Sequence, residues 1–139
     1  MTARIDTLPR RIVVATRNHG KLRELRELFS STGVELMDLD AARVDETEDE
    51  DALEAFETFE ENALAKARHF FRRTGVATIA DDSGLAVAAL GGAPGVRSKR
   101  FAGATGSTAD VERANNEKLQ RELAGVGDRR AMFVCAAAY

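Results

Sequence analysis

The chain has 139 residues and a formal net charge of −3, with 44% hydrophobic and 31% charged residues. This composition is ordinary for a soluble globular protein, and its acidic balance argues against a general nucleic-acid-binding protein. The single cysteine, Cys135, excludes an intramolecular disulfide and a cysteine-based zinc site, and no apolar run approaches the ~18 residues of a membrane-spanning helix.

The first third of the chain predicts two strands separated by a helix. Residues 1–11 are a polar lead without the apolar core of a secretory signal, so we expect a cytoplasmic protein. Residues 11–16 form a compact β-branched run that is typical of a buried strand. Residues 21–31 place their leucines on one helical face, and residues 34–39 alternate like a half-exposed strand.

Residues 45–61 are rich in Asp and Glu and contain no Lys or Arg. One interpretation is a solvated acidic loop that runs into a helix start, where acidic side chains suit the helix dipole. The other is that one or two of these carboxylates bind a metal ion. The composition of the segment leaves both interpretations open.

The remainder of the chain predicts two further helices, over residues 59–73 and 110–123. Residues 76–80 and 131–139 are apolar runs that predict buried strands, with a short strand possible over 85–90, and Cys135 is expected to be a packed core thiol. Strands and helices alternate, which predicts one α/β domain over residues 1–139 with a central mixed sheet.

Two adjacent carboxylates, Asp81 and Asp82, follow the predicted strand 76–80. Neighbouring side chains on a strand face opposite ways, so the two share a site only if the backbone turns, which Ser83-Gly84 permits. Two negative charges this close need a cation or hydrogen-bond donors. The stretch is therefore either a divalent-metal and general-base site or a turn or helix cap.

Residues 16–21 join a strand end to a helix that opens with Gly20 and Lys21. A helix N-terminus presents unpaired N–H groups that bind phosphate, Gly20 lets the backbone approach an anion, and Lys21 adds a positive charge. The spacing is not that of a Walker A loop, and the alternative is a simple turn. His19 is either a ligand contact or a solvated loop residue. Lys66 is either a phosphate contact or a solvated helix lysine.

Ligands of open α/β sheets collect beyond the carboxyl ends of the strands. A phosphate-binding loop at one strand end and carboxylates at another suit Mg²⁺, which prefers oxygen ligands and often bridges to phosphates. The residues alone therefore indicate a metal-dependent enzyme that acts on nucleoside triphosphates or other phosphoesters.

Taken together, the motifs resemble the inosine/xanthosine triphosphate pyrophosphatase family. The similar segments are residues 14–21 (VATRNHGK), 58–68 (TFEENALAKAR), and 80–96 (from ADDSGL to LGGAPGV) with Ser98, Arg100 and Gly103. The resemblance implies an elongated mixed central β-sheet flanked by helices. It also implies that the protein forms a homodimer and binds a purine nucleoside triphosphate as its substrate. Neither a nucleic-acid polymer nor a membrane is expected as a partner.

The resemblance further implies Mg²⁺-dependent hydrolysis of non-canonical purine nucleoside triphosphates (ITP, dITP and XTP) to a monophosphate and pyrophosphate. By position, Asp82 resembles the general base and a metal ligand of the family. The positions that resemble its nucleotide contacts are Thr16, Arg17, Asn18, His19, Gly20, Lys21, Lys66 and Ser83.

Two departures from the family pattern stand out. The metal-binding glutamate of the family lies in a Glu-Thr-Gly-type segment, whereas residues 53–57 read LEAFE here, so Glu54 is the candidate second metal ligand. The family also continues well beyond Tyr139 with segments that recognise the purine base, so we expect a chain truncated at its C-terminus. The alternative function is a nucleotide- or polyphosphate-binding fragment without turnover.

Overall fold

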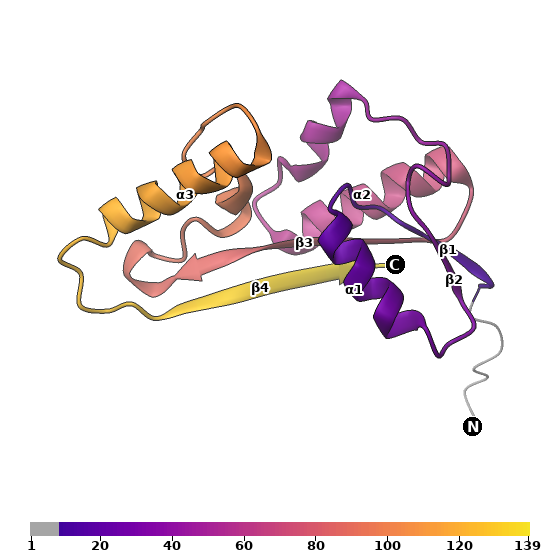
Figure 1. The fold of residues 1–139 in the computed structure, drawn as a ribbon, viewed down its shortest axis with the longest axis horizontal. Coiled ribbons are helices and arrows are strands. Elements are labelled where there is room, and N and C mark those ends of the chain that lie inside the picture. The colour runs from indigo at the N-terminus through magenta and orange to yellow at the C-terminus, as the bar shows by residue number, and fades with distance from the viewer. Residues whose placement is uncertain (1–8) are drawn as a thin grey trace.

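The computed structural model describes residues 9–139, and within them a four-stranded sheet has the order β2-β1-β3-β4 (Figure 1). β1 runs parallel to both β2 and β3, whereas β4 is antiparallel to β3. The predicted mixed sheet is therefore confirmed. The strands are β1 Arg11–Val14, β2 Glu35–Met37, β3 Thr78–Val87 and β4 Ala131–Ala138.

Each long helix begins at a polar side chain that caps its free N–H groups. Asn18 caps α1, Thr58 caps α2 through the Glu61 N–H, and Ser107 forms a capping box with Asp110 at the start of α3. The helices are α1 His19–Phe29, α2 Phe59–Thr74 and α3 Thr108–Glu122, with short 3₁₀ helices η1 Glu48–Glu54, η2 Ala88–Leu90 and η3 Gly95–Arg100.

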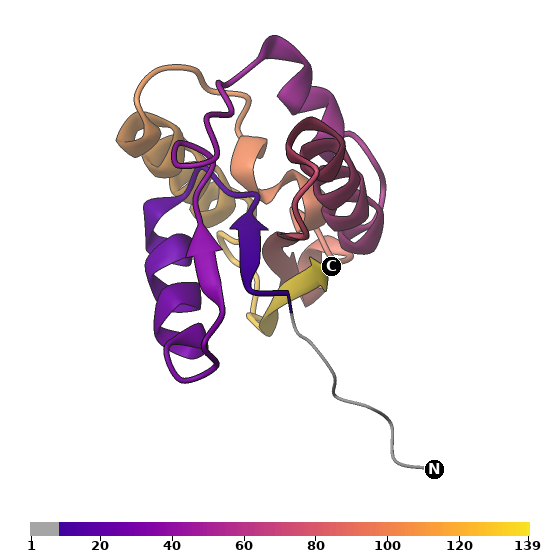
Figure 2. The same cartoon turned by 90° about the vertical axis from the view of Figure 1, so that its right-hand side faces the viewer.

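The long β3–β4 ribbon runs along most of the molecule, with β1, β2, α1 and α2 at one end and α3 at the other (Figure 1). Figure 2 shows α1 on one side of β1 and β2 and α2 on the other. The largest buried cluster includes Val13 and Ala80 from the strands and Ala67 and Phe70 from α2. Small residues on this face of α2 let the helix pack closely on β3 and β4, which fixes its polar side chains against the sheet.

β3 continues straight through Asp81–Gly84, so the predicted turn there, the alternative cap and the separate strand over 85–90 are all wrong. The reason is an antiparallel ladder with β4, which pairs every residue from Ala80 to Val87 and keeps the backbone extended. Gly84 serves close packing instead of a turn, because a Cβ there would lie 2.5 Å from the Ser98 Oγ.

The prediction that residues 131–139 are buried is also wrong. Met132 is 64% exposed, Phe133 is 71% exposed, and the Cys135 thiol lies at the surface and not in the core. Within residues 9–139, β4 pairs only with β3, so it forms the edge of the sheet. No helix in this described range is long and apolar enough to cross a membrane. The expectation about the polar lead concerns residues that lie mostly outside the described range.

Candidate active site

The candidate site lies at the C-terminal end of β1, beside the part of β3 that extends beyond its pairing with β1. β1 pairs with β3 only through Val13↔Thr78 and Val14↔Ile79, while β3 extends eight residues further along β4. The loop after β1 therefore faces the stretch of β3 that begins at Ala80. A strand end of this kind in an open α/β sheet is where ligands collect.

Asp82 points from β3 toward α2 and is 8% exposed. Its Oδ2 accepts a hydrogen bond of 2.9 Å from the Nδ2 of Asn62, and Asn62 is fully buried. The Oδ1 of Asn62 in turn accepts from the Phe56 N–H at 2.9 Å. Asn62 thus holds the carboxylate in one orientation and ties it to the segment before α2.

Sequence reasoning missed Asn62. Asparagine is a weak helix former, and its position beside Ala63 on the buried face of α2 was the available signal. A buried polar side chain normally has a partner, so an asparagine on an otherwise apolar helix face predicts a polar group opposite it.

Asp81 points to the opposite face of β3. Its Oδ2 accepts from the Lys21 Nζ at 2.5 Å, and the same ammonium donates to the Ser83 Oγ at 2.8 Å. Asp81 and Asp82 therefore do not converge. Across the strand pair, the Cys135 Sγ lies 3.8 Å from the Asp81 Oδ2. The partial loss of water around the sulfur, followed by the charge of Asp81, raises the pKa of this thiol.

The loop before α1 is organised by Asn18. Its Oδ1 accepts from the N–H groups of Gly20 at 2.9 Å and Lys21 at 3.2 Å, and its own N–H donates to the Thr16 Oγ1 at 3.1 Å. His19 is exposed beside a small hollow that Thr16 and Asp38 also line. The positive end of the α1 dipole therefore lies at this loop.

Arg17 of the same loop directs its side chain away toward the acidic segment. Its Nη2 and Nε donate to the two carboxylate oxygens of Glu50 at 2.7 and 3.3 Å, and its Nη1 donates to the Val44 carbonyl at 3.0 Å. The hydrogen bonds to Glu50 raise the pKa of Arg17 above its ordinary value.

Glu54 at the end of η1 and Lys66 of α2 form a half-buried pair, with the Lys66 Nζ 3.2 Å from the Glu54 Oε1. Burial alone would raise the pKa of Glu54, but the charges of Lys66 and Lys99 outweigh it, so the pKa is lowered. Glu54 is therefore a carboxylate at neutral pH. The Arg100 Nη2 also donates to the Glu54 carbonyl at 2.6 Å.

Within residues 9–139, no three or more His, Cys, Asp or Glu side chains come together to hold a metal ion. A site with fewer protein carboxylates would still suit Mg²⁺. Mg²⁺ is commonly bound by one or two carboxylates, with substrate phosphates and water as the other ligands. Asp82 and Glu54 are two carboxylates of this kind, placed on the α2 side of β3 and at the end of η1.

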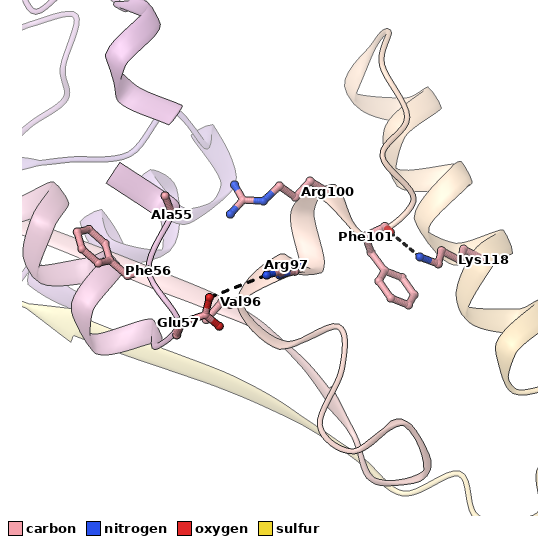
Figure 3. Close-up of a pocket in the computed structure, with 8 residues that line it drawn as sticks. All are labelled: Ala55, Phe56, Glu57, Val96, Arg97, Arg100, Phe101 and Lys118. Carbon is pink, nitrogen blue, oxygen red and sulfur yellow. Dashed lines mark hydrogen bonds and ion pairs between the residues drawn. The ribbon is translucent and has the colours of Figure 1, made fainter. Parts of the chain in front are cut away.

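A cavity of about 550 Å³ opens between the segment before α2 and the η3–α3 region (Figure 3). Its cationic side chains already have partners: the Arg97 Nη2 lies 3.9 Å from Glu57, and the Lys118 Nζ donates to the Phe101 carbonyl at 2.9 Å. Its lining residues are Ala55, Phe56, Glu57, Val96, Arg97, Arg100, Phe101 and Lys118.

Residues 12–139 match the Ham1 family. The chain belongs to this family. It is 53% identical over 125 residues to the dITP/XTP pyrophosphatase of Bordetella pertussis, covering 90% of this chain and 56% of that protein. It is 47% identical over 133 residues to the dITP/XTP pyrophosphatase of Burkholderia pseudomallei, covering 96% and 61%.

Solved structures of Ham1 proteins share the fold. The HAM1 protein from Coxiella burnetii superimposes with a TM-score of 0.75 at 37% identity, over 92% of this chain and 61% of that one. The dITP/XTP pyrophosphatase from Mycobacterium abscessus gives 0.69 at 45% identity, over 92% and 64%. The family resemblance and the fold class are therefore confirmed, and the chain spans about three fifths of the length of these Ham1 relatives.

Proposed function

We propose that this chain hydrolyses the non-canonical purine nucleoside triphosphates dITP, XTP and ITP to a nucleoside monophosphate and pyrophosphate in the presence of Mg²⁺. Relatives at 53% and 47% identity are dITP/XTP pyrophosphatases. The observation that carries the proposal is the buried Asp82 carboxylate, which Asn62 holds on the α2 side of β3, one residue from the Asp81 carboxylate that pairs with Lys21 near the N-terminus of α1.

Asp82 acts as the general base in this proposal. A carboxylate held by a single fixed donor keeps acceptor capacity to orient a water molecule and take its proton. Asp82 and Glu54 would hold Mg²⁺, which screens the negative charge of the phosphates when bound.

In this proposal the triphosphate is bound by the loop before α1 and by Lys21 and Lys66. The positive end of α1 favours an anion, and Asn18 caps the Gly20 and Lys21 N–H groups there in the free protein. Lys21 and Lys66 each neutralise a carboxylate in the free protein, and phosphate oxygens offer both ammonium groups an alternative partner. The remaining proposed contacts are the main chain of Arg17 and the side chains of Thr16, His19 and Ser83.

The test is pyrophosphate release by the 139-residue chain with Mg²⁺ and each of dITP, XTP, ITP, dGTP and ATP. Release from the first three in clear excess over dGTP and ATP supports the proposal. Because the chain spans only part of its relatives' length, nucleotide or polyphosphate binding without turnover is the second candidate function. Calorimetric binding of dITP with no pyrophosphate release would favour that candidate, and neither binding nor release would overturn both.

We also propose a cytoplasmic homodimer, as the family resemblance implies. Sedimentation equilibrium at micromolar concentration tests the dimer, and a monomer at every concentration would contradict it.

A further inference from the structure

The segment that carries Glu54 has little intrinsic reason to be ordered. η1 is a seven-residue 3₁₀ helix, longer than such helices usually run. None of its residues is fully buried, and Leu53 is partly buried against the core cluster. Its first turn contains four acidic side chains, Glu48, Asp49, Glu50 and Asp51, whose charges repel one another. Other parts of the molecule must therefore fix its position.

Glu50 is the acidic side chain of this turn that is drawn inward, with 13% of its side chain exposed. Arg17 binds both of its carboxylate oxygens from the loop after β1. Arg73 approaches the Glu50 Oε1 to 3.8 Å from the end of α2. Glu50 is thus held between the loop after β1 and the end of α2.

The same two arginines also hold the backbone leading into η1. The Arg17 Nη1 donates to the Val44 carbonyl at 3.0 Å, and the Arg73 Nη1 donates to the Asp45 carbonyl at 3.2 Å. The planar guanidinium of Arg17 therefore bonds a carboxylate and a carbonyl at once, which a lysine ammonium cannot match in geometry.

We propose that the Arg17–Glu50 pair is a positioning device that couples the nucleotide-binding loop to the segment carrying Glu54. In this role Arg17 acts through Glu50, and its side chain is not a contact to the triphosphate. The role of Glu54 in this inference rests on the proposed function. The coupling between the two segments does not, because it can be measured in the protein without nucleotide or metal.

Amide hydrogen exchange of the chain without nucleotide or metal tests the coupling. Arg17→Met and Glu50→Gln should each speed exchange across residues 44–54 by at least about fivefold, because local opening then breaks fewer of the contacts that hold the segment. The double variant should be no faster than the faster single variant, since both changes remove the same pair. Arg17→Lys should restore part of the protection.

Arg11→Met is the matched control, because Arg11 forms an exposed pair with Glu35 at 3.2 Å where β1 and β2 begin. It should leave exchange across residues 44–54 unchanged. Unchanged exchange in Arg17→Met and Glu50→Gln would overturn the proposal, as would additive effects in the double variant.

Calorimetry with dITP and Mg²⁺ separates the two roles open to Arg17. A positioning role predicts that Glu50→Gln weakens binding about as much as Arg17→Met. Weaker binding in Arg17→Met alone, with Glu50→Gln like wild type, would show a direct nucleotide contact and overturn the proposal. Absence of dITP hydrolysis by the wild-type chain would overturn the proposed function, while the exchange experiment would still decide the coupling.

Discussion

The two faces of β3 place adjacent aspartates in contrasting surroundings. On the α2 face, Asp82 is buried and receives a hydrogen bond from the neutral amide of Asn62. On the other face, Asp81 pairs with the Lys21 ammonium and lies beside the exposed Cys135. Because adjacent side chains of a strand point to opposite faces, the two carboxylates have different surroundings without any turn in the backbone.

The largest expected effect is on the Asp82 side. Asp82→Asn should lower pyrophosphate release from dITP by about 10²- to 10⁴-fold, because the amide cannot accept a proton from water. Calorimetry should show that the variant still binds dITP. The control is Asp128→Asn, whose exposed carboxylate pairs with Arg130 far along the chain. Retained turnover in Asp82→Asn would remove Asp82 from the role of base.

Removing the partner of Asp82 should cost stability. Asn62→Ala leaves the Asp82 carboxylate and the Phe56 N–H without their hydrogen-bond partner in a buried setting, at a cost of about 2 kcal/mol in the free energy of unfolding. Urea denaturation measures this change. Asn116→Ala on the exposed face of α3 is the control. Equal stability of the two variants would show that the Asn62 bridge is unimportant.

A smaller effect is expected on the Asp81 side. The pKa of the Cys135 thiol is raised by the partial loss of water around the sulfur and by the charge of Asp81, so a smaller fraction of the thiol is thiolate at a given pH. Asp81→Asn should lower this pKa and speed alkylation by iodoacetamide at pH 8 by a few-fold. The control is Asp128→Asn, and an unchanged or slower rate in Asp81→Asn would contradict the proposed neighbour effect.

Much of the fold follows from local pattern. The helices were predicted to within a few residues because their caps and apolar periodicity lie in adjacent sequence, as Thr58 and Gly75 do for α2. The sequence did not predict that β3 continues through Asp81–Gly84, because Asp, Ser and Gly are poor strand formers. Pairing with β4, about fifty residues later, overrides that preference.

Some residues of the candidate site are likewise evident from local sequence, and others only from the fold. The loop around Asn18 and the Asp81-Asp82 pair stand out in the sequence through residue type and spacing. The partners Asn62 and Glu50 do not, because each contact joins segments that are distant along the chain. The charge run of residues 45–61 was interpreted as a solvated loop or a metal-binding segment, and neither interpretation identified the inward Glu50.

The most direct test of the contrast between the two faces is to measure kcat for pyrophosphate release from dITP by Asp81→Asn and Asp82→Asn under the same conditions. If the buried face carries the base, Asp81→Asn keeps kcat within about tenfold of wild type while Asp82→Asn loses at least about a hundredfold. An equal loss in both variants, or a larger loss in Asp81→Asn, would contradict the assignment.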